Sequence, residues 1–117
     1  VHCHTCGKRY PNRDFIDGKF HCECGGFLRP SVVLFGEMLP YDAITAAETE
    51  TTKADLFIVL GSSLSVSPAN HFPVEAKQNG AKLVIVNMEA TDYDSLADLV
   101  INERKIGEVL KEIDKKL

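Results

Sequence analysis

The chain has 117 residues, of which 44 % are hydrophobic and 26 % charged, as is typical of one small globular protein with a modest core. Seventeen acidic against thirteen basic residues give a formal net charge of −4, which disfavours direct binding to nucleic acid. No apolar run approaches the roughly 20 residues that span a bilayer, and no secretory segment opens the chain. We therefore expect a cytoplasmic protein with no membrane partner. The start at Val1, two residues before the first cysteine, suggests a piece of a longer protein.

Four cysteines form two close pairs, Cys3-x-x-Cys6 and Cys22-x-Cys24, with fifteen residues between the pairs. Each pair places two thiolates near one point, and the span between them can fold back so that four sulfurs surround one ion. That span is polar and rich in turn residues, so metal binding has to supply much of its folding free energy. The pattern predicts one structural zinc site.

Two other interpretations of the cysteines are open at this stage. They could form a disulfide framework, for which four cysteines allow three pairings, or they could be reduced thiols without a metal. His2, His4 and His21 lie beside the cysteines and could substitute as ligands. We interpret them as flanking residues, because four thiolates already complete a closed structural site.

The pattern changes near residue 30 from turn-rich to alternating strand and helix signals, which predicts two modules. Residues 1–30 are expected to form a zinc-binding small lobe, and residues 31–117 the C-terminal part of a Rossmann-like domain. Strands are expected at 31–35, 56–60, 82–86 and 99–101, and helices at 42–52, at 69–79 and at the C-terminus. The apolar positions of the C-terminal helix are Ile106, Val109, Leu110, Ile113 and Leu117.

This alternation predicts an α/β fold with a parallel sheet that carries helices on both faces. The continuous apolar run 56–60 is typical of a strand that is covered on both faces. Ligands of such folds bind beyond the carboxyl ends of the strands, where Gly61-Ser62-Ser63 and Asn87 are found. By themselves these residues are equally typical of a turn and a loop cap. Glu37 is a candidate catalytic carboxylate or a solvated loop residue, and His71 is interpreted as structural.

The order of the motifs resembles the C-terminal half of the sirtuins, the NAD-dependent protein deacylases. After the cysteine pairs come R-P-x-V-V-x-F-G-E at 29–37, G-S-S-L at 61–64 and L-V-I-V-N at 83–87, so the resemblance covers nearly the whole chain. It implies that the zinc is structural and takes no part in the reaction. It also implies a second cofactor, the co-substrate NAD. The residues implied at the NAD site are Gly61, Ser62, Ser63, Asn87, Met88 and Ile101.

The resemblance further implies that acylated-lysine peptides or proteins are the partners. Val33 and Phe35 would line the tunnel for the acyl-lysine, while Gly36, Glu37 and Val66 would flank the peptide. Main-chain hydrogen bonds of the β-augmentation type would hold a peptide with little demand on its sequence.

No catalytic residue is expected within this chain. In the sirtuins the Gly-rich phosphate loop and the catalytic histidine precede the first cysteine pair, so the missing N-terminal half of the same domain is also an expected partner. The parent protein is expected to be an enzyme, and the isolated chain to be inactive. Two alternatives are a mono-ADP-ribosyltransferase on the same fold and a non-catalytic zinc-containing module that binds acylated peptides. The sequence does not specify the preferred acyl chain.

Overall fold

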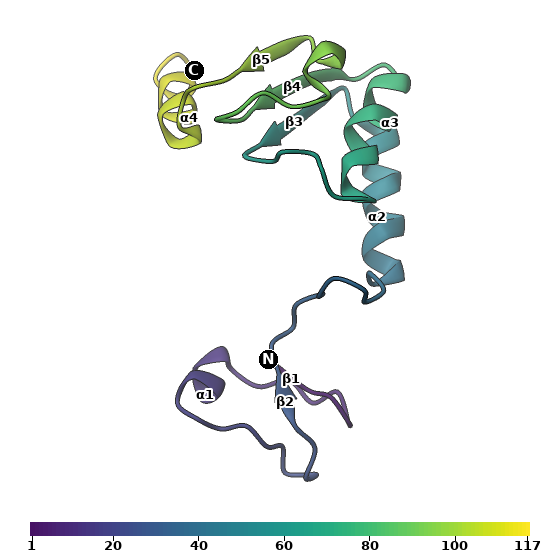
Figure 1. The fold of residues 1–117 in the computed structure, drawn as a ribbon, viewed down its shortest axis with the longest axis vertical. Coiled ribbons are helices and arrows are strands. Elements are labelled where there is room, and N and C mark those ends of the chain that lie inside the picture. The colour runs from purple at the N-terminus through teal and green to yellow at the C-terminus, as the bar shows by residue number, and fades with distance from the viewer. The chain divides into compact units, whose positions relative to one another are not determined.

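The computed structural model describes all residues from 1 to 117, which fold into two compact units, Val1–Leu39 and Pro40–Leu117 (Figure 1). The sequence-based boundary after residue 30 lies nine residues before this division, since residues 31–39 make their contacts within the first unit. The assignment of domains at that boundary stays a prediction. None of the helices combines the length and the apolar character that crossing a bilayer requires.

The first unit is built around a two-stranded antiparallel ribbon, in which β1 (His2–Cys3) pairs with β2 (Leu28–Arg29). The helix α1 (Asn12–Ile16) lies between them in sequence and follows Pro11. The small core of this unit consists of Cys3, Cys22 and Leu28, and partly buried side chains pack against it, namely Val1, Tyr10 and Phe15. A core this small contributes little hydrophobic stabilisation, as the turn-rich sequence predicts.

The prediction of a strand at residues 31–35 is wrong, because these residues form turns and irregular backbone. The backbone N–H of Glu37 donates to the carbonyl of Leu34 at 3.0 Å, which closes a turn where the strand was expected to end. Although Val32 and Val33 favour strands, β-branched residues form one only when a neighbouring strand supplies hydrogen bonds and a packing surface. Both valines are exposed here, and no strand pairs with them.

The second unit contains a three-stranded parallel sheet in the order β3-β4-β5. The strands are β3 (Leu56–Leu60), β4 (Lys82–Val86) and β5 (Leu99–Ile101), and each has the bounds expected from the sequence. The helices are α2 (Tyr41–Lys53), α3 (Phe72–Gln78) and α4 (Ile106–Asp114), with short 3₁₀ turns η1 (Ala69–His71) before α3 and η2 (Asp94–Leu96) before β5. The expected helix 69–79 therefore exists as a 3₁₀ turn followed by an α-helix.

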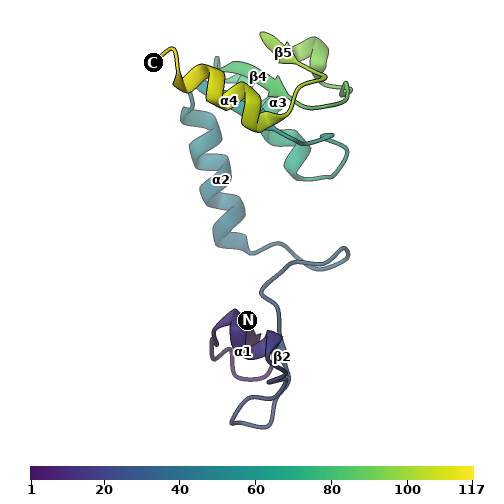
Figure 2. The same cartoon turned by 90° about the vertical axis from the view of Figure 1, so that its left-hand side faces the viewer.

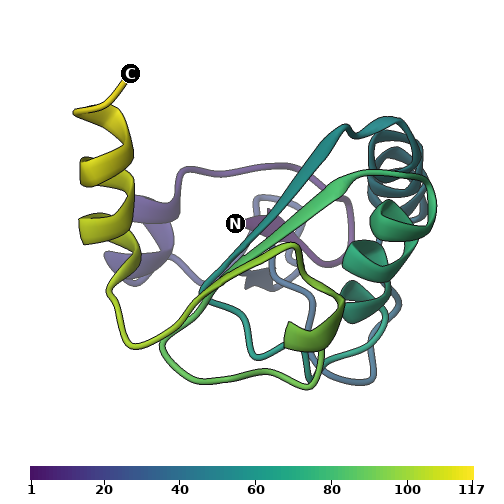
Figure 3. The ribbon, with the colours of Figure 1, turned by 90° about the horizontal axis from the view of Figure 1, so that it is seen from above.

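Helices cover both faces of this sheet, which confirms the predicted α/β class. In Figure 3 the strands overlap, so that α2 and α3 (teal) are seen on one side of the sheet and α4 (yellow) on the other. Figure 2 shows α4 crossing in front of the strands. The core on one face is formed by Val59, Leu83 and Ile85 together with Leu64 of the loop after β3. Alternation along the strands places these three side chains on the same face.

The opposite face of β3 is open, so the expectation that this strand is covered on both faces is wrong within this chain. The exposed fractions of Leu56, Ile58 and Leu60 are 54 %, 50 % and 44 %. β3 pairs only with β4, which leaves its other edge without a partner strand. The C-terminal helix covers part of the same side with Val109, which is buried. Leu117 lies beyond the end of α4 and is fully exposed, contrary to expectation.

Candidate metal centre and ligand-binding edge

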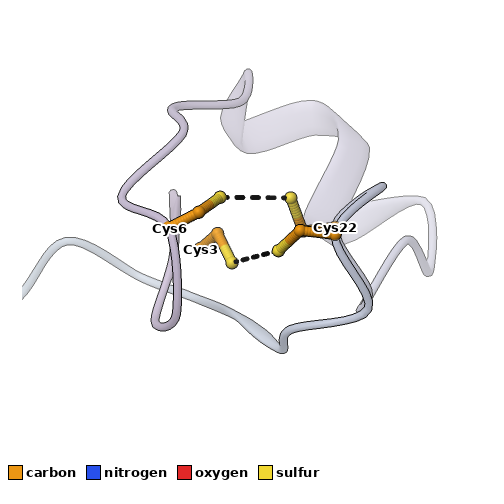
Figure 4. A group of neighbouring side chains, drawn as sticks. Cys3, Cys6 and Cys22 are labelled. Carbon is orange, nitrogen blue, oxygen red and sulfur yellow. Dashed lines mark hydrogen bonds between the residues drawn. The ribbon is translucent and has the colours of Figure 1, made fainter.

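The four cysteines meet at one point of the first unit, with their sulfur atoms turned toward one another (Figure 4). The Sγ atoms of Cys3 and Cys24 lie 3.6 Å apart, as do those of Cys6 and Cys22, and all four lie within 4.8 Å of one another. Two tight turns bring each pair together. Gly7 N–H donates to the Cys3 carbonyl at 3.0 Å, and Gly25 N–H donates to the Cys22 carbonyl at 2.9 Å.

Gly26 allows the second turn to approach the first. A Cβ atom at this position would lie 2.5 Å from Thr5 Oγ1 and 2.8 Å from Cys3 Sγ, far inside van der Waals contact. The glycine that follows the second cysteine pair is therefore required by the close approach of the two turns around the sulfur atoms.

The geometry fits a tetrahedral zinc ion. Zinc–sulfur bonds of about 2.3 Å at tetrahedral angles place the sulfurs about 3.8 Å apart, close to the observed spacing. The nearest sulfurs are far beyond the roughly 2.05 Å of a disulfide, and all four cysteines are free. A zinc ion bound here would cross-link the two turns, which is a structural role.

The ionisation of the thiols indicates the same need for a cation. The backbone N–H of Cys24 and then the Tyr10 hydroxyl lower the pKa of Cys22 to about 6. The Gly26 backbone N–H acts to lower the pKa of Cys24, but the hydrogen bonds among the neighbouring thiols outweigh it and raise that pKa to about 12. Four adjacent thiolates repel one another, so they ionise together only when a metal ion shares their charge.

The three histidines near the cysteines do not belong to the cluster, as expected. His2 Nδ1 is 2.8 Å from Ser31 Oγ, and the His21 ring packs against Phe27 with centroids 4.8 Å apart. Both rings are thus engaged with residues other than the cysteines.

The sequence interpretation missed Tyr10, whose hydroxyl oxygen lies 3.1 Å from Cys22 Sγ. Two lysine ammonium groups lie near its ring, with Lys19 Nζ 4.6 Å and Lys8 Nζ 5.5 Å from the centroid. The available signal was the single tyrosine between the cysteine pairs, an aromatic residue with a hydroxyl that can bond to sulfur. Its contact with Cys22 depends on how the turns close, which spacing alone does not specify.

Glu37 is held by Arg29, which neither interpretation from sequence anticipated. The guanidinium donates from Nη1 to Oε1 at 2.9 Å and from Nη2 to Oε2 at 3.1 Å, while the Leu34 N–H donates to Oε2 at 3.0 Å. These bonds, that of Arg29 foremost, lower the pKa of Glu37. A carboxylate with these partners is a poor general base. Instead, Glu37 fixes the turn that presents Phe35, which is 93 % exposed.

The loops after β3 and β4 lie at the same edge of the sheet, as predicted. Gly61 N–H donates to the Val86 carbonyl at 2.8 Å, and Asn87 N–H donates to the Ile101 carbonyl at 3.1 Å, so the three strands end side by side. Gly61 has φ +65°, and a Cβ atom there would lie 2.7 Å from Ile106 Cδ1. This edge is the place where open parallel sheets bind ligands.

The side chains at this edge form hydrogen bonds that close their own loops. Ser62 Oγ accepts from the Leu64 N–H at 3.2 Å, and Ser63 Oγ lies 2.8 Å from Ser65 Oγ. Asn87 Nδ2 donates to the Glu89 carbonyl at 2.8 Å, which is the loop-capping role considered above. Their assignment to a nucleotide, and that of Met88 and Ile101, stays a prediction.

The loop between β3 and α3 contains two further residues singled out from the sequence. His71 Nε2 lies 2.9 Å from Ser67 Oγ, and this contact closes the loop before α3 in agreement with a structural role. Val66 in the same loop is 48 % exposed, and its contact with a peptide stays a prediction.

Comparison with known proteins assigns the family. A profile of the Sir2 family matches residues 1–68, which is more than half of the chain. The chain belongs to the Sir2 family. It is 61 % identical over 117 residues to a protein of Geobacillus kaustophilus named NAD-dependent protein deacetylase 1, and 57 % identical over 113 residues to an NAD-dependent protein deacetylase of Oceanobacillus iheyensis. These alignments cover 100 % and 97 % of this chain but 48 % of each relative. The chain thus spans about half the length of these Sir2 relatives.

Solved Sir2 structures resemble the chain over the same extent. One described as Sir2Tm bound to a propionylated peptide matches with a TM-score of 0.89 and 36 % identity, covering 98 % of this chain and 51 % of its own. A second, described as a Sir2–p53 peptide–NAD⁺ complex, matches with a TM-score of 0.86 and 35 % identity over 98 % of this chain and 50 % of its own.

Proposed function

We propose that the chain is the zinc-bearing C-terminal half of an NAD-dependent protein deacetylase. The observation that carries this proposal is the identity of 61 % and 57 %, over nearly the whole chain, with proteins named as such. This degree of identity supports the same fold and, at matching motifs, the same binding surfaces as in these relatives.

NAD is the proposed co-substrate, bound at the carboxyl edge of the sheet. The main-chain N–H groups of the turn 61–63 suit phosphate or ribose oxygens, and the Asn87 amide suits ribose hydroxyls. The bond from Gly61 N–H to the Val86 carbonyl supports a shared site, because it holds the ends of β3 and β4 together. Met88, half exposed beside Asn87, and Ile101 at the end of β5 are the proposed apolar neighbours of the adenosine.

An acylated-lysine peptide is the proposed substrate, as in the propionylated-peptide complex of a Sir2 relative. The apolar side chains Val33 and Phe35 are exposed in the turn that Arg29 and Glu37 hold, and they suit the stem and acyl group of such a lysine. Gly36 and Glu37 of this turn, and Val66, are the proposed flanks of the peptide. Direct nucleic-acid and membrane partners are not proposed.

The remaining half of the domain is proposed to complete the sheet along β3. Three observations support it: the edge of β3 has no partner strand, the face with Leu56, Ile58 and Leu60 is exposed, and the relatives are about twice as long. The catalytic groups are expected in that half. A cytoplasmic location is also proposed, because clustered cysteines in a reducing compartment bind metal rather than form disulfides; cell fractionation tests this location.

A chimera of the Geobacillus kaustophilus relative, with this chain in place of its matching half, tests the proposal. It is expected to remove acetyl groups from an acetyl-lysine peptide only when NAD is present. Asn87→Ala in the chimera should raise the KM for NAD by about tenfold, as expected for the loss of one or two hydrogen bonds. Asn79→Ala is the matched control, since Asn79 lies after α3, at the opposite end of the strands.

Three results would contradict the proposal. A folded, zinc-loaded chimera without activity would contradict the assignment of this chain to a deacetylase, and an unchanged KM for NAD in Asn87→Ala would exclude the proposed nucleotide contact. Transfer of labelled ADP-ribose to protein in place of deacetylation would instead support the mono-ADP-ribosyltransferase alternative.

A further inference from the structure

We propose that Tyr10 is a positioning residue of the metal centre, whose hydroxyl donates a hydrogen bond to the Cys22 thiolate and strengthens its hold on zinc. The inference starts from the 3.1 Å distance between Tyr10 Oη and Cys22 Sγ. Tyr10 itself is not a metal ligand. The inference rests on the fit of the four cysteines to zinc.

The direction of the hydrogen bond follows from the chemistry of the ligand. A cysteine that binds zinc does so as a thiolate, which has no proton and only accepts. The phenol must therefore be the donor. Hydrogen bonds to charged acceptors are about twice as strong as those between neutral groups, so this contact affects the sulfur more than an ordinary hydroxyl contact would.

The two lysines near the Tyr10 ring reinforce this role. A zinc ion with four thiolates carries about two negative charges, which positive charges close to the site offset. Lys19 and Lys8 place their ammonium groups near the aromatic ring, where Lys19 also pairs with Asp14 at 3.4 Å and Lys8 with Glu23 at 2.6 Å. The attraction between these ammonium groups and the ring helps to hold the phenol beside Cys22.

The location of Tyr10 shows how its hydroxyl is directed. Its backbone N–H donates to the Val1 carbonyl at 2.9 Å, and its side chain packs against the core formed by Cys3, Cys22 and Leu28. The Thr5 N–H donates to Cys3 Sγ at 3.4 Å. Cys22 and Cys3, the two buried ligands, thus each receive a donor from outside the cysteine set.

Tyr10→Phe tests the role, because it removes one oxygen atom and keeps the ring that packs in the core. The rate of zinc transfer from the loaded chain to a chromogenic chelator should rise about tenfold, the lower end of the effect of losing an outer-shell partner. With cobalt in place of zinc, the sulfur-to-cobalt charge-transfer band should move to lower energy, since the sulfur lone pair is no longer stabilised. Tyr41→Phe is the matched control, with a tyrosine that is 80 % exposed in the second unit, and should change neither readout.

The proposal would be overturned if Tyr10→Phe had the same zinc release rate and the same cobalt band as the unsubstituted chain. If Tyr10→Phe fails to fold around the metal, 3-fluorotyrosine provides the second measurement, because its more acidic phenol is a stronger donor. The cobalt band should then move to higher energy, and this shift should be absent when Tyr10 alone is left unlabelled. A labelled chain with an unmoved band would again overturn it. These readouts require no catalysis, so they remain decisive whether or not the parent protein is a deacetylase.

Discussion

Asp98 and Lys77 are joined by a hydrogen bond of 2.6 Å, and the oxygen that accepts it, Oδ2, also accepts the Leu83 N–H at 2.8 Å. The carboxylate thereby connects the helix α3, the strand β4 and the start of β5. The Lys77 ammonium and then the Leu83 N–H lower the pKa of Asp98 from 3.8 to about 2. This link lies at the amino ends of the strands, opposite the proposed nucleotide site, and its role is stability.

The first prediction concerns the pH dependence of this link. Because the folded pKa of Asp98 is lowered, its contribution to stability is complete above about pH 5 and is lost as the pH falls through 4 toward 2. Asp98→Asn should lower the Tm at pH 7 by about 5 °C and should flatten the decline of the free energy of unfolding below pH 5. Thermal unfolding monitored by circular dichroism at several pH values measures both, with the exposed Asp92→Asn as control. Equal slopes in the two variants would contradict the assignment.

The second prediction concerns the turn held by Arg29 and Glu37. Glu37→Gln removes the charge and one acceptor, so the Leu34 N–H should exchange with solvent roughly three to ten times faster, as expected for a partly exposed ion pair. The pKa of Glu37 is lowered by Arg29, so the same loosening should occur in the parent chain as the pH falls below the normal range of a glutamate. Hydrogen exchange resolved by NMR measures this amide. Glu48→Gln, on the exposed surface of α2, is the control and should leave the exchange rate of the Leu34 N–H unchanged. An unchanged rate in Glu37→Gln would contradict the role assigned to the ion pair.

The strands of the sheet were predictable because their signal is local. Residues 56–60 and 83–86 are continuous apolar runs, and a glycine or an asparagine follows each of them. The cysteine cluster was predictable for a similar reason, since short spacings limit where four sulfurs can lie. The proposed NAD residues could be placed at one edge because parallel strands share the direction of their carboxyl ends.

The contacts of Tyr10 and Glu37 were not predictable, because each depends on the conformation of an irregular turn. The strand expected at residues 31–35 was wrong for a related reason, as strand propensity describes a fit to neighbouring strands that this unit does not supply. The open face of β3 was also unforeseen. An apolar run indicates that a strand is suited to burial, but the residues that bury it need not belong to the same chain.

The third prediction concerns the close approach at Gly26. Gly26→Ala places a methyl group against Thr5 Oγ1 and Cys3 Sγ at 2.5 and 2.8 Å, so the two turns have to separate. Zinc affinity, measured by competition with a chelator, should fall by about tenfold or more, since the ligand geometry is disturbed. Gly107→Ala is the matched control. A methyl group there meets nothing within 4 Å in α4, so this variant should keep the zinc affinity of the unsubstituted chain. Unchanged zinc affinity in Gly26→Ala would contradict the requirement for glycine at this position.

The fourth prediction is that removal of zinc unfolds the first unit and spares the second. The core of the first unit contains Cys3 and Cys22 themselves, so its packing depends on the ion that holds these sulfurs. The buried residues of the second unit, with Val59, Leu64, Leu83 and Ile85 as its main cluster, include no cysteine. A chelator, or Cys24→Ser, should therefore reduce the exchange protection of amides in residues 1–29 by roughly 100-fold or more. The amides of β3 and β4 serve as the internal control and should keep their protection, and added zinc should restore the first unit in the parent chain but not in Cys24→Ser. Protection that persists without metal, or that disappears from both units together, would contradict a structural zinc confined to this unit.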